Sequence, residues 1–369
     1  MKSLSKSAYQ RRTGFVFLLS ASLVGPLIGL LTATGRVSAA EPKSMLAKGD
    51  RVVFIGDALI EQEQYHGWIE LELTRRLRSG NVIFRNLGWS GDTPAGKSRT
   101  GLSLVQAGYE PEGEGWRQLQ KQIKQTQPTV ALIGYGMASA LEAKDDGVAS
   151  QTEADQFVSQ YNRLIGFLRK VQPDCRLVCL SPITPVGKTS LTDDDIRQYQ
   201  QAVQTIARDH QALFIDLSNL AMDDALRKDP IHLNDDGYRA AAQLIAESLV
   251  ASSPDAPSPT DTDSELVGDL KTDGPSRDEM LRKSIIEKNR LWFHRSRPAN
   301  MAYVFGFRKR EQGQNAIEIP QYDPLIEQLE QRIAKLSAGV ISSDDHATAT
   351  ASRLESKYAK FTPQSKPEF

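Results

Sequence analysis

The chain has 369 residues, of which 40% are apolar and 25% charged, a composition typical of globular proteins and sufficient for one sizeable domain with appendages. The formal net charge is −1. It becomes −6 without residues 1–39, which hold five of the 45 basic residues and none of the 46 acidic residues. This acidic balance argues against a nucleic-acid partner.

Residues 1–39 have the pattern of an export signal. Basic residues precede an uncharged run over 13–35, and small residues follow at 38–40. The uncharged run is also long enough to span a bilayer, so cleavage and an uncleaved membrane anchor both remain open, with cleavage favoured. We therefore expect an exported protein, periplasmic or secreted, whose mature form does not span the membrane if the signal is cleaved.

Short β-rich segments alternate with amphipathic segments over residues 45–251. The predicted strands are 51–55, 81–86, 129–135, 176–182 and 212–217. The predicted helices are about 64–79, 115–126, 152–171, 193–209 and 235–250. Near-continuous apolar strands separated by helices indicate a parallel sheet covered on both faces. Because such sheets bind ligands beyond the carboxyl ends of their strands, the turns at these ends should carry the chemistry.

The two cysteines, Cys175 and Cys179, lie in the apolar run CRLVCL. Four residues apart in a strand, their Cα atoms would be about 13 Å apart, too far for a disulfide. Neither has further metal ligands nearby in the sequence, so both are expected to be buried apolar side chains. We expect no metal and no cofactor.

The carboxyl-terminal part differs in composition from residues 45–251. Residues 252–276 are rich in Pro, Ser, Thr and Asp and predict a disordered linker. An extension over 277–340 contains two predicted helices, at 280–298 and 323–336, and 341–369 predict a disordered tail. Aromatic and basic residues of this extension either cover a sugar or acyl site or pack against the α/β domain; we favour packing.

Four short motifs fall in the turns where a ligand site is expected. Asp57-Ala58 follows the first strand, Ser90-Gly91 the second and Ala138-Ser139 the third, and Asp229-Pro-Ile-His232 precedes the last helix. In this order they resemble the four blocks of the SGNH (GDSL) hydrolases. The resemblance covers about residues 50–250 and implies a flavodoxin-like three-layer α/β sandwich with a five-stranded parallel sheet. With the mainly helical extension, the chain looks like secreted bacterial proteins that carry a divergent SGNH-like domain.

The resemblance also implies roles for these residues. In that family a serine in G-D-S is the nucleophile, a glycine and an asparagine complete the oxyanion hole, and D-x-x-H supplies the acid and base. Asp229 and His232 match the acid and base, and Gly91 matches the oxyanion glycine. Ala58 occupies the position of the nucleophile, and Ala138 that of the asparagine. Since a methyl group can neither give up a proton nor attack a carbonyl, an acyl-serine mechanism through position 58 is excluded.

Three possibilities remain open. His232, oriented by Asp229, activates water as a general base. Alternatively Ser90 or Ser139 replaces the nucleophile, although serines in turns commonly bond to nearby backbone. The third possibility is a pocket that only binds.

Our leading hypothesis is a non-catalytic or strongly impaired hydrolase homologue that binds a small ester, glycan or protein at this site. The alternative is an active esterase or carbohydrate deacetylase, and a third reading is a structural protein of the cell surface. The sequence identifies no particular protein partner.

Overall fold

The computed structural model describes residues 45–77, 81–99, 113–146, 150–220, 224–251, 276–297 and 319–340. All of them belong to one compact unit, Glu41–Phe369. The predicted export signal, nearly all of the predicted linker and the predicted tail lie outside the described residues. Among the residues that are described, the helices are all too short or too polar to cross a membrane.

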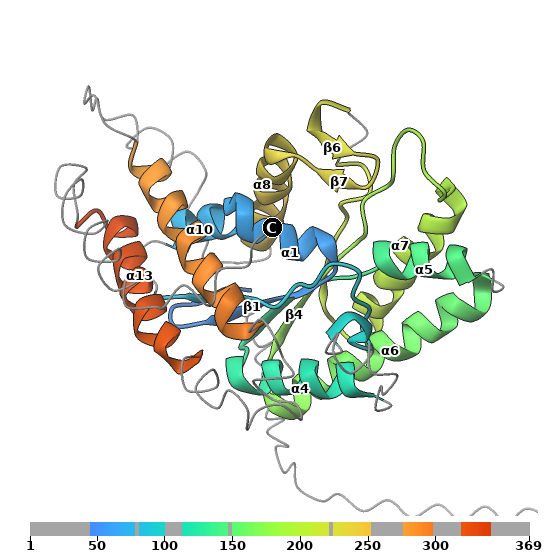
Figure 1. Ribbon diagram of the computed structural model, residues 1–369, viewed down its shortest axis with the longest axis horizontal. Helices are drawn as coiled ribbons and strands as arrows, with labels where there is room; N and C mark the ends of the chain where they lie inside the picture. Colours follow the sequence, from blue (N-terminus) through green and yellow to red (C-terminus); the bar gives the residue numbers. More distant parts are fainter. Residues whose placement is uncertain are drawn as a thin grey trace, which may run out of the picture. The chain divides into compact units, whose positions relative to one another are not determined.

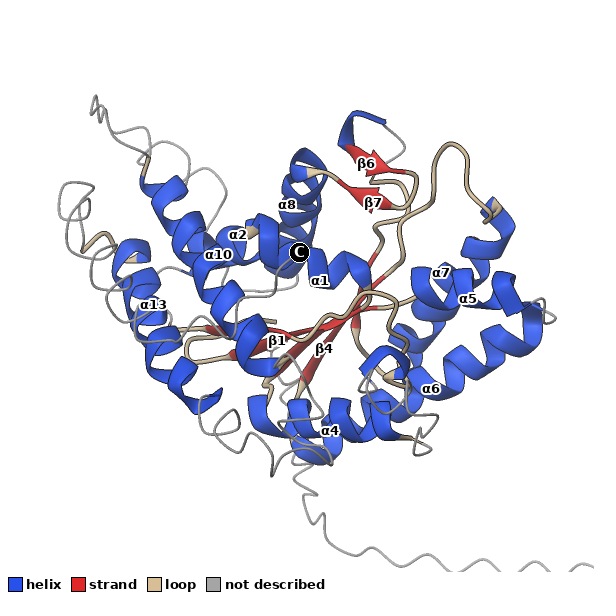
Figure 2. Cartoon of the chain, viewed as in Figure 1, coloured by secondary structure: helices blue, strands red, loops and turns tan. Residues whose placement is uncertain are grey.

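The centre of the fold is a five-stranded parallel sheet (Figure 2). Its strands follow the order β2-β1-β3-β4-β5, and every neighbouring pair is parallel. The bounds are β1 Arg51–Gly56, β2 Ile83–Asn86, β3 Val130–Gly134, β4 Arg176–Leu180 and β5 Leu213–Ile215. The predicted flavodoxin-like α/β sandwich is therefore confirmed.

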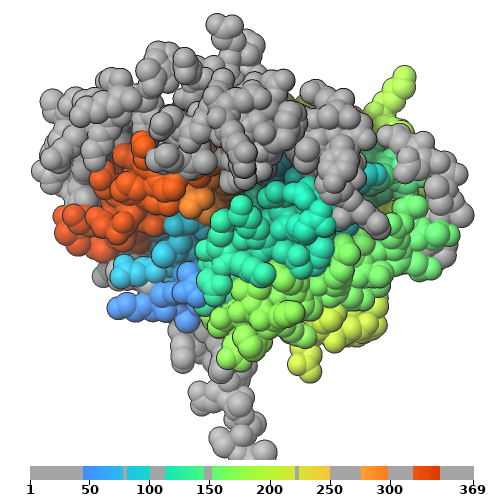
Figure 3. All heavy atoms as spheres, turned by 60° about the horizontal axis from the view of Figure 1, so that its bottom comes forward, coloured from blue at the N-terminus to red at the C-terminus, as the bar shows by residue number. Residues whose placement is uncertain are grey.

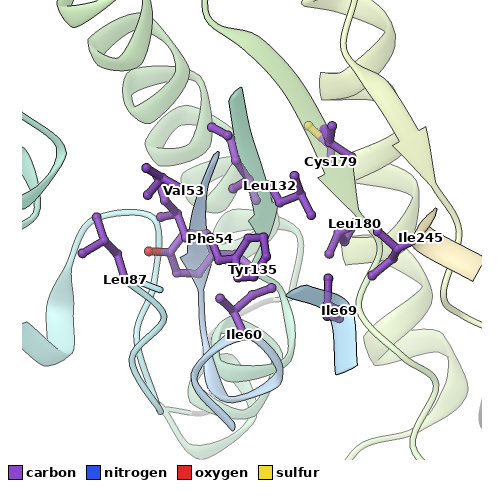
Figure 4. Close-up of a cluster of buried hydrophobic side chains, with 14 of the residues drawn as sticks. Val53, Phe54, Ile60, Ile69, Leu87, Leu132, Tyr135, Cys179, Leu180 and Ile245 are labelled. Atoms are coloured by element: carbon purple, nitrogen blue, oxygen red, sulfur yellow. The ribbon is translucent and has the colours of Figure 1, made fainter. Parts of the chain in front are cut away.

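The strands form where the sequence has continuous apolar runs. Val52 and Val53 of β1 and Val130 and Ile133 of β3 are completely buried, as expected for strands covered on both faces. Figure 4 shows Val53, Phe54, Leu132 and Leu180 gathered around this core with Ile60 of the first helix and Ile245 of the last helix of the α/β domain. Cys175 and Cys179 are buried and unpaired within it.

Helices cover both faces of the sheet (Figure 1). One layer contains α1, α2 and α8, and the other contains α4, α6 and α7; Figure 3 shows α4 and α6 side by side on the surface of the second layer. α5 follows β3 and packs against α6 and α7. The bounds are α1 Ala58–His66, α2 Trp68–Leu77, α4 Glu114–Thr126, α5 Met137–Asp146, α6 Ser150–Val171, α7 Asp193–Asp209 and α8 Asp235–Ala251.

The prediction of a single helix over 64–79 was wrong. The chain forms two helices here, because Gly67 adopts φ +70° and ends α1. α1 begins directly after β1, much earlier than predicted. Its buried residues include Glu61, Glu63 and Gln64, so the helix shows no apolar stripe that a sequence pattern could reveal.

The carboxyl-terminal extension contains two long helices that pack against each other, α10 Arg277–Ser296 and α13 Tyr322–Ser337 (Figure 1). α10 also packs on the sheet at its β2 edge. There Trp292 Nε1 donates to Asn86 O at 2.9 Å, and Lys288 donates to Phe84 O at 3.3 Å and to the buried Glu70 carboxylate. The prediction that this part packs on the α/β domain holds for the described residues.

Short elements complete the fold. They are the 3₁₀ turns Lys97–Arg99, Asp224–Leu226 and Ile319–Gln321 and the strands β6 Arg227–Asp229 and β7 His232–Leu233. β6 and β7 pair as a separate antiparallel hairpin that leads into α8.

Candidate functional site

A cavity of about 600 Å³ lies beyond the carboxyl ends of β1 and β3. This is where the strand order reverses, which is the usual ligand position in a doubly wound sheet. Of the predicted site residues, the cavity wall contains Ala58, Ser90, Gly91, Ala138 and His232. Its other wall residues are Asp57, Leu59, Lys97, Ser98, Gly134, Tyr135, Met137, Leu141, Glu142, Ser181, Pro182, Ile183 and Ile231.

Two predicted residues lie outside this wall. Asp229 does not line the cavity but contacts His232, which does. Ser139 lines a neighbouring cavity of about 470 Å³ instead. The structure therefore brings Ser90, and not Ser139, into the cavity that contains the imidazole.

The turn after β1 is organised by Asp57. Asp57 caps α1, of which Ala58 is the first residue, and its carboxylate accepts from Leu59 N at 3.4 Å. The same carboxylate accepts from Gly136 N and Ala138 N, each at 3.2 Å. Burial raises the pKa of Asp57 to about 6, against the lowering effect of these hydrogen bonds. The side chain thus joins the turn after β1 to the turn after β3.

The turn after β2 depends on two glycines. A Cβ atom on Gly88 would lie 2.4 Å from Glu61 N, so only glycine permits this approach to α1. Gly91 adopts φ +71°, a left-handed conformation. Behind the turn, Asp92 forms a fully buried ion pair with Arg99, with Nε and Oδ2 2.8 Å apart.

Asp229 and His232 face each other across the β6–β7 hairpin. Asp229 Oδ1 accepts from Ile231 N at 3.0 Å and from His232 N at 2.9 Å, and Asp229 Oδ2 lies 2.8 Å from His232 Nδ1. Partial burial opposes ionisation, but these hydrogen bonds and the nearby imidazole outweigh it and hold the pKa of Asp229 below its usual value. The turn geometry explains the three-residue spacing: it places the carboxylate beside Nδ1 and leaves the ring at the cavity.

Each of the three serines in the cavity wall donates its hydroxyl to a group other than His232. Ser90 Oγ donates to the Glu61 carboxylate. Ser98 Oγ donates to Gly91 O at 2.7 Å, and Ser181 Oγ donates to Asp216 Oδ1 at 3.0 Å.

Sequence reasoning missed several groups at the site. Lys97 and Glu142 form an ion pair on the cavity wall, and Glu61 receives Ser90. No local pattern pointed to Glu61, because it precedes the helix that was predicted over 64–79 and its place in the first turn of α1 appears only in the structure. No cluster of His, Cys, Asp and Glu side chains within the described ranges is arranged to hold a metal ion.

The fold and the turns at its cavity define an α/β protein of the hydrolase type. The chain belongs to the GDSL-like Lipase/Acylhydrolase family, whose model matches residues 54–240. The match includes all four turns and ends before the carboxyl-terminal extension. A search of curated proteins gives no match.

Solved structures of similar proteins include one from Parabacteroides merdae ATCC 43184 described as a GDSL-like lipase, with 16% identity, a TM-score of 0.44, and coverage of 56% of this chain and 99% of that one. A catalytic mutant of Axe2, an acetylxylan esterase from Geobacillus stearothermophilus, has 17% identity, a TM-score of 0.43, and coverage of 56% and 96%. The acetyl xylan esterase AlAXEase has 22% identity, a TM-score of 0.39, and coverage of 53% and 98%. At such values none of them bears on what this chain does.

Proposed function

We propose that this protein is an exported, ligand-binding member of the family that lacks acyl-serine hydrolysis. One observation carries the proposal. The residue at the start of α1 is Ala58, and its methyl group lines the same cavity as His232. A histidine held by an aspartate at this point is arranged to serve a serine hydroxyl, and position 58 offers none.

The energetic consequence of the alanine is large. In a well-studied serine protease, removing the nucleophile lowers turnover about 10⁶-fold. Loss of a side-chain donor from an oxyanion hole costs about 10²- to 10³-fold, and Ala138 provides no such donor at the position that the family resemblance assigns to asparagine. The partners of the serines in the wall support the proposal, because each hydroxyl donates to a group other than His232.

The cavity wall supports a ligand with both apolar and polar parts. Apolar side chains form much of it: Leu59, Met137, Leu141, Ile183 and Ile231. The imidazole and the Lys97–Glu142 pair add polar groups. A small acylated compound, such as an ester or an acetylated glycan, matches this combination.

A second candidate function is hydrolysis by a water molecule that His232 activates. The Asp229–His232 contact at 2.8 Å favours it, because the carboxylate fixes the ring orientation and 35% of the imidazole side chain is exposed. Such a reaction needs no side-chain nucleophile.

Hydrolysis of p-nitrophenyl acetate separates the two candidates. We expect the parent protein and His232→Ala to match the buffer rate. Ala58→Ser, alone or with Ala138→Asn, should gain turnover that disappears when His232→Ala is added. Turnover by the parent that His232→Ala abolishes would instead favour activated water, and labelling of Ser90 by an active-site phosphonate would contradict the proposal.

The export part of the proposal rests on residues 1–39. Mature protein recovered from a periplasmic or culture fraction, with its amino terminus near residue 40, would support it. Recovery of full-length protein in the membrane fraction would indicate an anchor.

A further inference from the structure

The turn Gly88–Asp92 is held from two sides. On its inner side, Arg99 pairs with Asp92 and donates to Leu87 O at 2.7 Å, and Tyr135 donates to Asp92 at 3.1 Å. On its outer side, the Glu61 carboxylate accepts from both Ser90 N, at 2.9 Å, and Ser90 Oγ. The residues on both sides of the turn lie within the family match over 54–240.

The partner of Glu61 comes from the carboxyl-terminal extension. Arg297, the residue that caps the carboxyl end of α10, pairs with Glu61 Oε1, while Glu61 Oε2 receives Ser90. The two side chains are only 9% and 11% exposed. The Arg297 guanidinium also lies 4.4 Å from the ring centre of Trp89 and 4.5 Å from that of Phe293. Both contacts are within the range of cation–π attraction.

The helix that carries Arg297 is itself fixed on the α/β domain. The buried Lys288–Glu70 pair and the Trp292–Asn86 hydrogen bond lie on the same helix, one to three turns before its end. In addition, Gln122 of α4 donates to Ser296 O at 3.1 Å, next to Arg297. The guanidinium is therefore presented by a rigid element, which favours a defined position for the groups that it holds.

From these contacts we infer that α10 is a positioning element of the cavity, and that Arg297, acting through Glu61, fixes the Ser90–Gly91 segment of its wall. Without Arg297, a nearly buried carboxylate loses its charge partner, which leaves its charge uncompensated. Its hold on the Ser90 N–H then weakens, and the segment that carries Gly91 loses its outer support. The positioning of this segment does not depend on the proposed function. Only its role in ligand binding rests on the proposed function.

Amide hydrogen exchange in the full-length protein tests the positioning itself. We expect Arg297→Gln to accelerate exchange at the Ser90 amide, which donates to Glu61, by about tenfold or more, while β1 and β3 keep their protection. Glu61→Gln, which also breaks the ion pair, should accelerate exchange at the same amide. Arg295→Gln is the matched control, because Arg295 lies two residues earlier and pairs with Asp323 instead.

Two results would overturn the inference. The first is unchanged exchange at the Ser90 amide in Arg297→Gln. The second is an equal acceleration throughout the sheet, which would mean that Arg297 supports only global stability.

A functional measurement follows in the Ala58→Ser/Ala138→Asn background. There Arg297→Gln should lower kcat more than it raises KM, and Arg297→Lys should recover part of the loss. Equal kinetics with and without Arg297 would contradict a positioning role. If this background has no activity, the proposed function fails at position 58, and the exchange measurement still decides the role of Arg297.

Discussion

Asp57 accepts hydrogen bonds from the backbone N–H groups of Gly136 and Ala138, so a single buried carboxylate joins the turns after β1 and β3 that carry the two alanines of the site. Positions 58 and 138 carry only methyl side chains. The hydrogen bonds of Asp57 show that the two turns are nevertheless held in a fixed arrangement. A serine introduced at position 58 would need such a fixed arrangement around it.

Asp57 should make stability depend on pH. Its pKa is about 6 in the folded protein and 3.8 as the ordinary value, so between these pH values the folded state binds more protons than the unfolded state. This contribution therefore favours folding at low pH and is lost as pH rises through 6, by about 2 kcal/mol between pH 4 and pH 7. Urea unfolding of the parent and of Asp57→Asn across this range measures the difference between their free energies of unfolding. The free energy of the parent should fall relative to that of Asp57→Asn as pH rises. A difference that stays constant would show that Asp57 does not titrate as inferred.

The Asp229–His232 pair should matter once a nucleophile is present. In the Ala58→Ser/Ala138→Asn background, Asp229→Asn should lower kcat by up to about 10⁴-fold, because an amide no longer stabilises the correct tautomer and the imidazolium. In the parent, the same change should leave p-nitrophenyl acetate hydrolysis at the buffer rate. A decrease of less than a few-fold in the restored enzyme would mean that another group orients His232.

The buried Lys288–Glu70 pair should stabilise the contact between α10 and the α/β domain. Burial raises the pKa of Glu70 and lowers the pKa of Lys288. The opposite charge of the partner counteracts both shifts. Lys288→Met should cost about 3 to 5 kcal/mol of unfolding free energy, because it leaves Glu70 buried without its cation. Combining it with Glu70→Leu should recover much of this loss in a double-mutant cycle.

Lys283→Met is the control for that cycle, since Lys283 lies on the same helix and its side chain is 65% exposed. It should change the unfolding free energy by less than about 0.5 kcal/mol. Equal losses of unfolding free energy in Lys288→Met and Lys283→Met would contradict a stabilising role of the buried pair.

Two glycines should respond to alanine with opposite signs. At Gly88 the added Cβ would lie 2.4 Å from backbone of α1, so Gly88→Ala should destabilise by about 1 to 3 kcal/mol. Gly166 lies exposed within α6, with no atom near an added Cβ, so Gly166→Ala should stabilise by up to about 1 kcal/mol. Thermal unfolding of both variants measures this contrast, and destabilisation by Gly166→Ala would contradict it.

The sequence was sufficient for the sheet and for most of its helices. Runs such as RVVFI are apolar and β-branched, and they become buried strands because both faces are covered. The Asp229–His232 contact followed from the family resemblance, and the hairpin turn explains its spacing. α1 and α5 were missed because neither has a continuous apolar stripe, and α1 buries acidic side chains.

Long-range polar contacts lay beyond sequence reasoning. Glu61 and Arg297 are 236 residues apart, and each alone has the appearance of an ordinary surface charge. Only the packing of α10 on the sheet brings them together. The same holds for Lys288, because no local pattern distinguishes this buried lysine from Lys283, the exposed lysine of the same helix.

The hydrogen bonds of α10 to β2 also bear on how the chain is made. β2 is an outer strand, and Lys288 and Trp292 occupy two of its carbonyl groups, at Phe84 and Asn86. During synthesis the sheet can assemble before these two side chains leave the ribosome, and in that interval the strand offers a template to any other extended chain. A variant truncated after residue 251 should therefore self-associate. In the full-length chain, α10 would protect this edge strand from aggregation.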